Sequence, residues 1–313
     1  MGSSFEAGLF RTGVVGLLVA VVTGLGLSAL ARLVLARLRS RAITRELRLS
    51  ALGFGSLFLA EVGCLAWAAF VEPGWLEVTH LEVKTPLLPA GKRLRIAHFS
   101  DTHIDGRSPL IDSLPERVAE LKPDLVVFTG DAATNEEDLE KFRVILRKMP
   151  ARLGRYLVRG NHETWKNLDA NVFEDAAVEL VGRPAATAGG ELTLCGAAFG
   201  FGERLDDCLK KAPAGVPTLV AYHTPDLVED LAPLGPTLYL AGHTHGGQVR
   251  MPFYGALVTL SRHDKKYEAG AYQVDRTTLY VNRGVGFEPR PAPAIRFLCR
   301  PELALIELVG TGT

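Results

Sequence analysis

The chain of 313 residues has the composition of a globular protein with balanced charge. Hydrophobic residues make up 47% of it, enough for a sizeable core in one large domain or two small ones. The 35 lysines and arginines match the 35 acidic residues in number, so no basic excess points to nucleic-acid binding. We therefore expect no nucleic-acid partner.

The four cysteines are far apart and form no C-x-x-C pair. They are Cys64, Cys195, Cys208 and Cys299. This spacing fits neither a zinc finger nor a disulfide scaffold, so we expect each cysteine to be a small buried hydrophobic residue. On this interpretation the cysteines identify no redox compartment.

The chain begins with a candidate membrane span. From Thr12 to Ala31, twenty consecutive residues carry no charge, which is the length needed to cross a bilayer. A cleaved signal peptide is the alternative, but it would have basic residues before a shorter apolar run and a small-residue cleavage site after it. Here the arginines follow the apolar run, which favours a span over residues 12–31.

A basic segment and a second apolar run follow. We place a basic loop at residues 32–48, and Leu49 to Val71 is apolar except for Glu61. A carboxyl group inside a membrane is costly, so this run is either a second span with Glu61 facing the first or a helix lying at the interface. We favour the span, over residues 49–71, and predict that residues 1–72 form a membrane anchor.

The arginines of the loop predict the orientation of this anchor. They are Arg32, Arg37, Arg39, Arg41, Arg45 and Arg48. If both runs cross the membrane, the positive-inside rule keeps these arginines in the cytoplasm and places everything after Pro73 on the periplasmic or extracellular side. If the second run lies on the surface instead, the downstream part remains at the cytoplasmic face.

Residues 73–313 have the pattern of one α/β domain, for which we expect a layered αββα sandwich. Short apolar runs typical of strands alternate with helix-compatible stretches. The predicted strands are Leu94–Ser100, Leu125–Thr129, Tyr156–Arg159, Leu192–Ala198, Thr218–Tyr222, Leu238–Ala241, Leu279–Asn282 and Ala304–Leu308. The predicted helices are Leu110–Leu121, Glu137–Met149 and Pro225–Leu231.

Most of the unusual polar residues follow predicted strands directly. Carboxylate, amide and imidazole side chains occur at these positions, including five of the eight histidines. The residues are Asp101, His103, Asp131, Asn161, His162, His223, His243 and His245. Because the carboxyl ends of strands meet at one crevice in layered α/β folds, we expect these side chains to converge.

Taken singly, these residues also fit a structural role, because Asp and Asn after a strand are common in turns and helix caps. The segment from Gly242 to Gly247 is more informative, since two histidines one residue apart are flanked by glycines. Together the donors suit Mn²⁺, Fe²⁺ or Zn²⁺, and no cysteine is among them. An aspartate such as Asp131 can bridge two metals roughly 3.5–4 Å apart.

The ordered motifs D-x-H, G-D, G-N-H-E, a later His and G-H-x-H resemble those of the calcineurin-like metallophosphoesterases. The resemblance extends from Leu94 to about Leu308. The segments SDTH, RGNHE, AGHTHGGQ, YVNRG and IRFLC are similar to bacterial membrane-associated phosphodiesterases, including the UDP-2,3-diacylglucosamine pyrophosphatase type. This resemblance implies a protein of the bacterial inner or plasma membrane with two divalent ions, for which we favour Mn²⁺.

The resemblance also implies a role for each residue. One metal is expected on Asp101, His103, Asp131 and His245, and the other on Asp131, Asn161, His223 and His243. Asp131 would bridge the two. His162 is expected to be catalytic, protonating the leaving oxygen or stabilising transition-state charge while a metal-bridging hydroxide attacks phosphorus. Thr134 stands where the protein phosphatases of the superfamily have a second Asp, so what orients His162 is left open.

These expectations define one leading hypothesis and two alternatives. We expect a phosphodiesterase or pyrophosphatase that acts on a membrane-associated lipid or nucleotide-lipid. A phosphomonoesterase is the first alternative, because the motifs do not separate monoesters from diesters. A non-catalytic membrane scaffold is the second, although such a protein would be expected to have lost some of these residues. The oligomeric state is not predicted.

Overall fold

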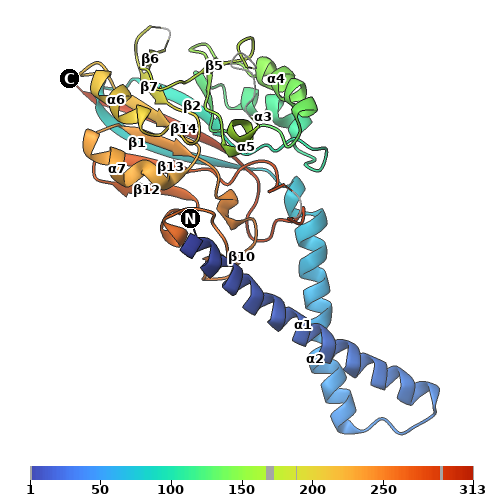
Figure 1. The fold of residues 1–313 in the computed structure, drawn as a ribbon. Coiled ribbons are helices and arrows are strands. Elements are labelled where there is room, and N and C mark those ends of the chain that lie inside the picture. The colour runs from blue at the N-terminus through green and yellow to red at the C-terminus, as the bar shows by residue number, and fades with distance from the viewer. Residues whose placement is uncertain (1, 167–172, 188, 290–291, 313) are drawn as a thin grey trace.

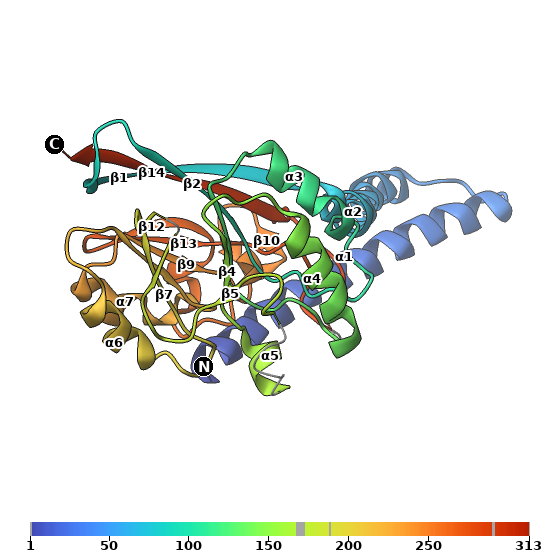
Figure 2. The ribbon, with the colours of Figure 1, turned by 90° about the horizontal axis from the view of Figure 1, so that it is seen from above.

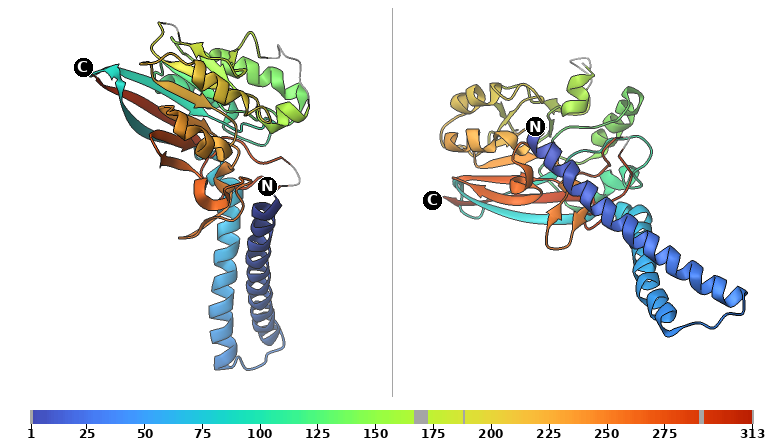
Figure 3. Two further views of the ribbon diagram at one scale, coloured as in Figure 1. Left: turned by 60° about the vertical axis from the view of Figure 1, so that its left-hand side comes forward. Right: turned by 60° about the horizontal axis from the view of Figure 1, so that its bottom comes forward.

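The computed structural model describes residues 2–166, 173–187, 189–289 and 292–312. It begins with two long helices, α1 (Gly2–Leu38) and α2 (Arg45–Phe70), which extend away from the remainder of the chain (Figures 1 and 3). Both are long and apolar enough to cross a membrane, and only 11% of the most apolar window of each is buried. Neither is therefore a core helix of the α/β part.

The two helices cross closely near their middles. Gly26 of α1 lies so near Phe58 of α2 that an added methyl group would be 2.4 Å from its Cβ. The Thr23 hydroxyl donates a hydrogen bond of 2.7 Å to Oε1 of Glu61. Glu61 thus faces the neighbouring helix, the arrangement predicted for a second span.

The basic loop is shorter than predicted. The predicted loop covered residues 32–48, but α1 continues to Leu38 and α2 starts at Arg45, leaving residues 39–44 between them. Arginine, alanine and leucine are good helix formers, so the basic residues extend the helices instead of breaking them. Thr44 caps α2, its hydroxyl accepting a hydrogen bond from the Leu47 amide.

Two six-stranded sheets form the remainder. The first has the order β1 (Glu77–Pro89), β14 (Glu302–Gly312), β2 (Arg93–Phe99), β3 (Leu125–Phe128), β4 (Arg155–Leu157) and β5 (Val178–Glu179). The second has the order β12 (Gly270–Val274), β13 (Thr277–Val281), β9 (Leu238–Ala241), β8 (Thr218–Ala221), β7 (Thr193–Gly196) and β6 (Ala185–Ala186). A separate hairpin pairs β10 (Arg250–Met251) with β11 (Gly255–Ala256).

Three clusters of buried side chains fill the spaces between the layers of helices and sheets. One lies between the two sheets and includes residues of β2, β3, β8 and β9. Another packs the first sheet against α3 (Leu114–Glu120) and α4 (Leu139–Lys148). The third packs the second sheet against α6 (Arg204–Lys211) and α7 (Val228–Leu231). This arrangement is the expected αββα sandwich (Figure 2).

Short helical segments complete the chain. The five-residue helix α5 spans Asn161–Trp165. The 3-10 turns are Glu72–Gly74, Ile111–Ser113, Glu136–Asp138, Pro225–Leu227, Ala232–Leu234, His245–Gly247 and Asp264–Tyr267. All eight predicted strands and all three predicted helices are present, β9 with the predicted bounds and the others with shifted ends. The elements that were not predicted are β1, β5, β6, β10, β11, β12, α5 and α6.

The cysteine prediction was wrong in part. Cys195 of β7 and Cys208 of α6 form a disulfide across 13 residues, and Cys64 is exposed on α2. Only Cys299 is a free buried thiol among the described residues. The disulfide forms because α6 packs on the second sheet with Cys208 facing β7, a tertiary contact that sequence spacing does not reveal.

Candidate metal centre

The eight predicted site residues lie at the carboxyl ends of strands from both sheets. Asp101 and His103 follow β2, and Asp131 follows β3. Asn161 and His162 begin α5 just after β4, while His223 follows β8 and both His243 and His245 follow β9. All except the half-buried His162 are buried. The expected convergence of these side chains is therefore present in the fold.

Several of these residues hold a left-handed backbone conformation. The φ angles are +50° at Asp101, +36° at His103, +60° at Asp131, +68° at His243 and +49° at His245. Residues other than glycine rarely adopt positive φ, and such conformations cost roughly 1–3 kcal/mol each. The surrounding fold holds five strained loop positions so that their side chains point into one place, which is typical of a functional site.

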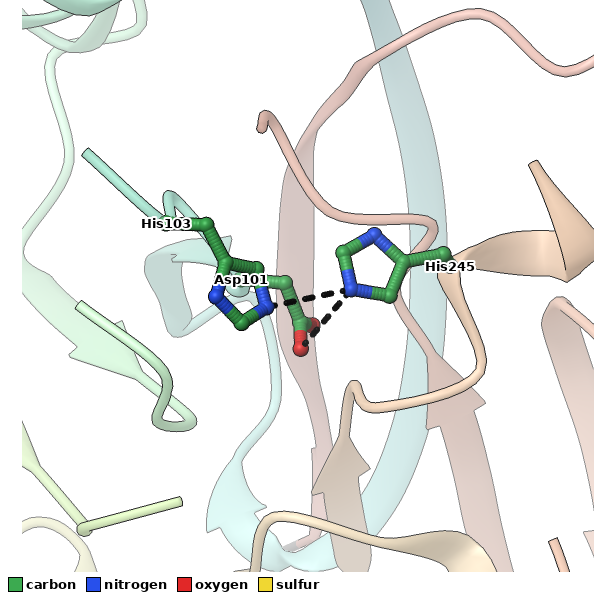
Figure 4. Close-up of side chains that lie close together, drawn as sticks. All are labelled: Asp101, His103 and His245. Atoms are coloured by element: carbon green, nitrogen blue, oxygen red, sulfur yellow. Dashed lines mark hydrogen bonds and ion pairs between the residues drawn. The ribbon is translucent and has the colours of Figure 1, made fainter. Parts of the chain in front are cut away.

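The first group of donors is Asp101, His103 and His245, shown in Figure 4. Their donor atoms lie within 4.8 Å of one another. The Nε2 atoms of His103 and His245 are 3.2 Å apart, and His245 Nε2 is 3.7 Å from Asp101 Oδ1. The two rings stack with centroids 5.1 Å apart.

The second group of donors is Asp131, His223 and His243. His223 Nε2 is 3.1 Å from His243 Nδ1 and 3.4 Å from Asp131 Oδ2. Asn161 joins this group, because its Oδ1 lies 2.9 Å from the same nitrogen of His223. The other nitrogen, His223 Nδ1, is 2.7 Å from the Thr129 carbonyl oxygen, which fixes the ring and leaves Nε2 directed at the site.

Asp131 lies between the two groups. Its Oδ2 is 3.4 Å from His103 Nε2 and also 3.4 Å from His223 Nε2. Its Oδ1 accepts a hydrogen bond of 3.0 Å from the His162 amide. One carboxylate oxygen is thus directed at both groups, which is the geometry required of a ligand that bridges two cations.

The donor chemistry fits divalent metal ions. Asp101 Oδ1 is buried and has no hydrogen-bond partner among the described residues. Ring nitrogens approach each other at 3.1 and 3.2 Å, and a pair of imidazoles can share only one proton across such a contact. Carboxylate oxygens and neutral imidazole nitrogens that converge in this way are suited to Mn²⁺, Fe²⁺ or Zn²⁺.

Burial and the charge of Asp131 determine the protonation of the histidines. Burial lowers the pKa of His103 and of His243 to about 3, and lowers the pKa of His245 well below its usual range. These three rings are neutral at pH 7, as metal ligation requires. Burial also opposes the charged form of His223, but the adjacent Asp131 carboxylate outweighs it and raises the pKa to about 10.

Glu163 holds the loops after β3 and β4 together. Its carboxylate accepts backbone hydrogen bonds from Gly160 at 2.8 Å, Asp131 at 2.9 Å and Ala132 at 2.6 Å. Gly160 cannot carry a side chain here, because an added methyl group would lie 2.1 Å from Asp131 Oδ1. The motif G-N-H-E therefore includes a positioning carboxylate that the predicted site did not contain.

His162 lies at the edge of the site. Its ring contacts His103 edge to face with centroids 4.9 Å apart and lies 5.7 Å from the Trp165 ring. Thr134 does not orient it through any described contact, since its hydroxyl donates to the His103 carbonyl oxygen at 3.4 Å. Burial lowers the pKa of His162, so its ring is also neutral near pH 7.

Glu288 is a second carboxylate that the sequence did not suggest. It follows no strand, yet its Oε2 lies 3.4 Å from His245 Nε2. Burial and the nearby charges of Asp131 and Asp101 raise the pKa of Glu288 to about 7. The irregular segment that carries it is held by the fully buried Arg296, which donates to the Gly286 carbonyl oxygen at 2.6 Å.

Comparison with known proteins identifies the family of this chain. The family profile described as calcineurin-like phosphoesterase matches residues 94–247. The uncharacterized metallophosphoesterase YkuE of Bacillus subtilis is 32% identical over 83% of this chain and 96% of its own length. Phosphodiesterase YaeI of Escherichia coli is 30% identical over 77% of this chain and 91% of its own.

A more distant relative is named after its substrate. The UDP-2,3-diacylglucosamine pyrophosphatase LpxG of Chlamydia trachomatis is 23% identical over 80% of this chain and 94% of its own length. The identity to YkuE over most of both chains, together with the matched profile, is sufficient to assign the family. This chain belongs to the calcineurin-like phosphoesterases, as its motifs suggested.

Proposed function

We propose that this protein is a membrane-anchored, two-metal hydrolase of phosphodiester or pyrophosphate bonds in a lipid or nucleotide-lipid. In this proposal residues 1–72 are the anchor and residues 73–313 the catalytic domain. One metal is held by Asp101, His103, Asp131 and His245, and the other by Asp131, Asn161, His223 and His243. Mn²⁺ is the favoured ion.

The observation that carries the proposal is the position of Asp131 between two groups of donors, 3.4 Å from a histidine of each. Two divalent cations, when bound, supply Lewis acidity toward a phosphate and a nucleophile from water at neutral pH. The protein contributes a shared carboxylate and imidazoles that are neutral at pH 7, except for His223, which must lose its proton when a metal binds. The two cations would favour binding of the anionic phosphate of a diester, or of a pyrophosphate group, beside His162.

His162 is the proposed catalytic residue. Its amide is fixed by Asp131 Oδ1 at 3.0 Å, and its half-buried ring faces both Asp131 and His103. Because burial lowers its pKa, the ring is mostly neutral at pH 7 and carries one N–H. In this protonation state the ring N–H can donate a hydrogen bond to a phosphate oxygen. This hydrogen bond would stabilise the negative charge that grows in the transition state.

Two observations support placing the catalytic domain outside the cytoplasm. The arginine-rich turn at the far end of α1 and α2 carries Arg39 and Arg41, which the positive-inside rule keeps in the cytoplasm. The Cys195–Cys208 disulfide forms and persists in an oxidising compartment. Both support our proposal that the α/β part lies on the periplasmic or extracellular side of a bacterial membrane.

The proposed substrate is amphiphilic. Two apolar helices would confine the enzyme to the surface where such molecules are concentrated, and the relative LpxG acts on a diacylated nucleotide sugar according to its name. The full chain in detergent should be loaded with Mn²⁺ and assayed on lipid pyrophosphates, phospholipids and a soluble chromogenic phosphodiester. Hydrolysis of none of these by metal-loaded protein would overturn the proposal and leave the scaffold alternative.

His162→Ala tests the catalytic residue in the same assay. We expect turnover to fall by about 10²–10³, the usual effect of removing one hydrogen-bond donor to transition-state charge, while the metal content stays at the wild-type level. His80→Ala is the matched control, because His80 is exposed on β1 away from the site. Wild-type turnover by His162→Ala would refute the role of His162.

Phosphomonoester hydrolysis remains the second candidate. It is separated from the first by comparing kcat/KM on a monoester and a diester of the same alcohol with the same metal-loaded protein. We expect the diester to be the better substrate, and a clear preference for the monoester would reverse the assignment.

A further inference from the structure

A groove of about 490 Å³ lies between helix α1 and the candidate metal centre. Val15 and Gly16 of α1 form one wall, and Leu257 and Leu260 form the opposite wall. Ile295 also lines the groove. The lining is thus mostly apolar.

Contacts at the N-terminal end of α1 hold this helix against the α/β part. Arg11 makes two hydrogen bonds to the Asp264 carboxylate, at 2.6 and 2.8 Å, and a third to the Leu257 carbonyl oxygen at 2.9 Å. Gly8 packs so closely on Val258 that an added methyl group would be 3.2 Å from its Cγ2. The wall formed by α1 is therefore fixed in place, one helical turn beyond Arg11.

The inner end of the groove reaches the metal centre. His245, a proposed ligand, and Glu288 both line it, with His245 Nε2 and Glu288 Oε2 3.4 Å apart. The groove thus connects the side of an apolar helix to the position where a phosphate would be hydrolysed.

The length of α1 places the groove at the membrane surface. Its 37 residues measure about 55 Å at 1.5 Å per residue, whereas a hydrocarbon core is about 30 Å thick. The excess allows the first turns to stand beside the α/β part, where Arg11 binds Asp264. Val15 and Gly16, one turn further along, then lie near the upper boundary of the hydrocarbon.

The hairpin of β10 and β11 also lies near the expected membrane surface. Figures 1 and 2 place β10 near the N-terminal half of α1, and the chain after β11 enters the groove wall at Leu257. Between the two strands, Phe253 is fully exposed and Tyr254 is 47% exposed. Exposed aromatic side chains at this position suit a membrane interface.

We propose that this groove binds one acyl chain of a membrane lipid whose phosphate occupies the metal centre. An acyl chain fits better than a peptide, because a peptide would bury backbone N–H and C=O groups against an apolar wall that offers them few partners. The wall shared with α1 lets the chain enter from the bilayer without crossing water. This inference rests on the proposed function and specifies how its substrate is held.

Photolabelling of the full chain in nanodiscs tests the inference without requiring turnover. The probe is a phosphatidic acid with a diazirine in the middle of one acyl chain, and labelled peptides are identified by mass spectrometry. We expect label on the segments containing Leu257–Leu260 and Ile295. Label confined to the outward-facing residues of α1 and α2 would overturn the inference.

Gly16→Phe provides the matched perturbation. Nothing lies within 4 Å of a methyl group added at Gly16, so the ring can enter the groove without displacing the backbone. We expect at least fivefold less label on residues 257–260, whereas Leu17→Phe, at a position 66% exposed and outside the lining, leaves the label unchanged. Equal labelling of the two variants would contradict the proposal.

A competition experiment covers the case in which Gly16→Phe does not fold. In wild-type protein, unlabelled dioleoyl phosphatidic acid should suppress groove labelling, and dibutyryl phosphatidic acid at the same concentration should not. Equal suppression by both lipids would show that the headgroup alone is recognised and would overturn the acyl site. Turnover of a soluble chromogenic phosphodiester, measured in parallel, tests the proposed function separately from the groove.

Discussion

At the scale of single residues, Asp131 dominates the electrostatics of the candidate site. Its buried carboxylate raises the pKa of His223 to about 10 and adds to the burial that raises the pKa of Asp101 to about 6. A bound divalent cation would compensate the negative charge of Asp131 in place of these protons. Binding requires that His223 is neutral and that Asp101 is charged. Metal binding and proton binding are therefore competitive at these residues.

This competition predicts proton release on metal loading. At pH 8 His223 is protonated in the metal-free protein while Asp101 is already charged, so binding should release about one proton. The apparent affinity should fall about tenfold per pH unit as pH decreases from 9 to 6, and more steeply below 6, where Asp101 also takes up a proton. Titration calorimetry in two buffers of different ionisation enthalpy measures the release; a value near zero with pH-independent affinity would contradict it.

At the scale of secondary-structure elements, strand ends could be predicted from sequence because each polar residue of the site directly follows an apolar run. Glu288 could not be found this way, since its segment is irregular and is organised by hydrogen bonds to Arg296 that have no local signal. Strand β1 was missed for a related reason. It pairs with β14 at the other end of the chain and alternates half-buried with exposed residues, so it lacks a continuous apolar run.

The disulfide could not be predicted for the same reason, because the pairing of Cys195 with Cys208 depends on how α6 packs on the second sheet. The Cys195–Cys208 disulfide closes a loop of 13 residues and should stabilise the fold by about 3 kcal/mol. Replacing both cysteines by serine should lower the free energy of unfolding by this amount in denaturant titrations, whereas the exposed Cys64→Ser should change it by less than about 0.5 kcal/mol. Identical midpoints for the paired variant and the oxidised wild type would exclude a structural disulfide.

At the scale of the whole molecule, both N-terminal helices are attached to the α/β part at one end. The Cys299 amide donates to the carboxylate of Glu72 just after α2, and the Trp67 indole donates to the same carboxylate at 3.1 Å. Cys299 in turn donates from Sγ to the carbonyl oxygen of His245 at 3.2 Å. The end of α2 is thus connected through two residues to a candidate metal ligand, while Arg11 attaches α1.

The Arg11 attachment should depend on pH in a defined direction. Its hydrogen bonds lower the pKa of Asp264 in the folded protein. The contribution of this ion pair to stability is therefore fully present above the pKa of about 4 in the unfolded chain, and it is lost as pH falls through the lower pKa of the folded protein. Arg11→Met should speed amide exchange in residues 257–264 by about fivefold at pH 7, as expected for a partly exposed pair worth about 1 kcal/mol. Arg41→Met, in the exposed turn, is the control, and equal exchange in both variants would contradict the attachment.

In the proposed site, side chains from five separate strand ends hold two cations around Asp131. Anomalous diffraction from crystals of the Mn²⁺-loaded protein, measured at the manganese edge, would locate these cations. Two peaks roughly 3.5–4 Å apart, both within coordination distance of Asp131, are expected. A single peak, or peaks that lie away from Asp131, would contradict the two-metal assignment.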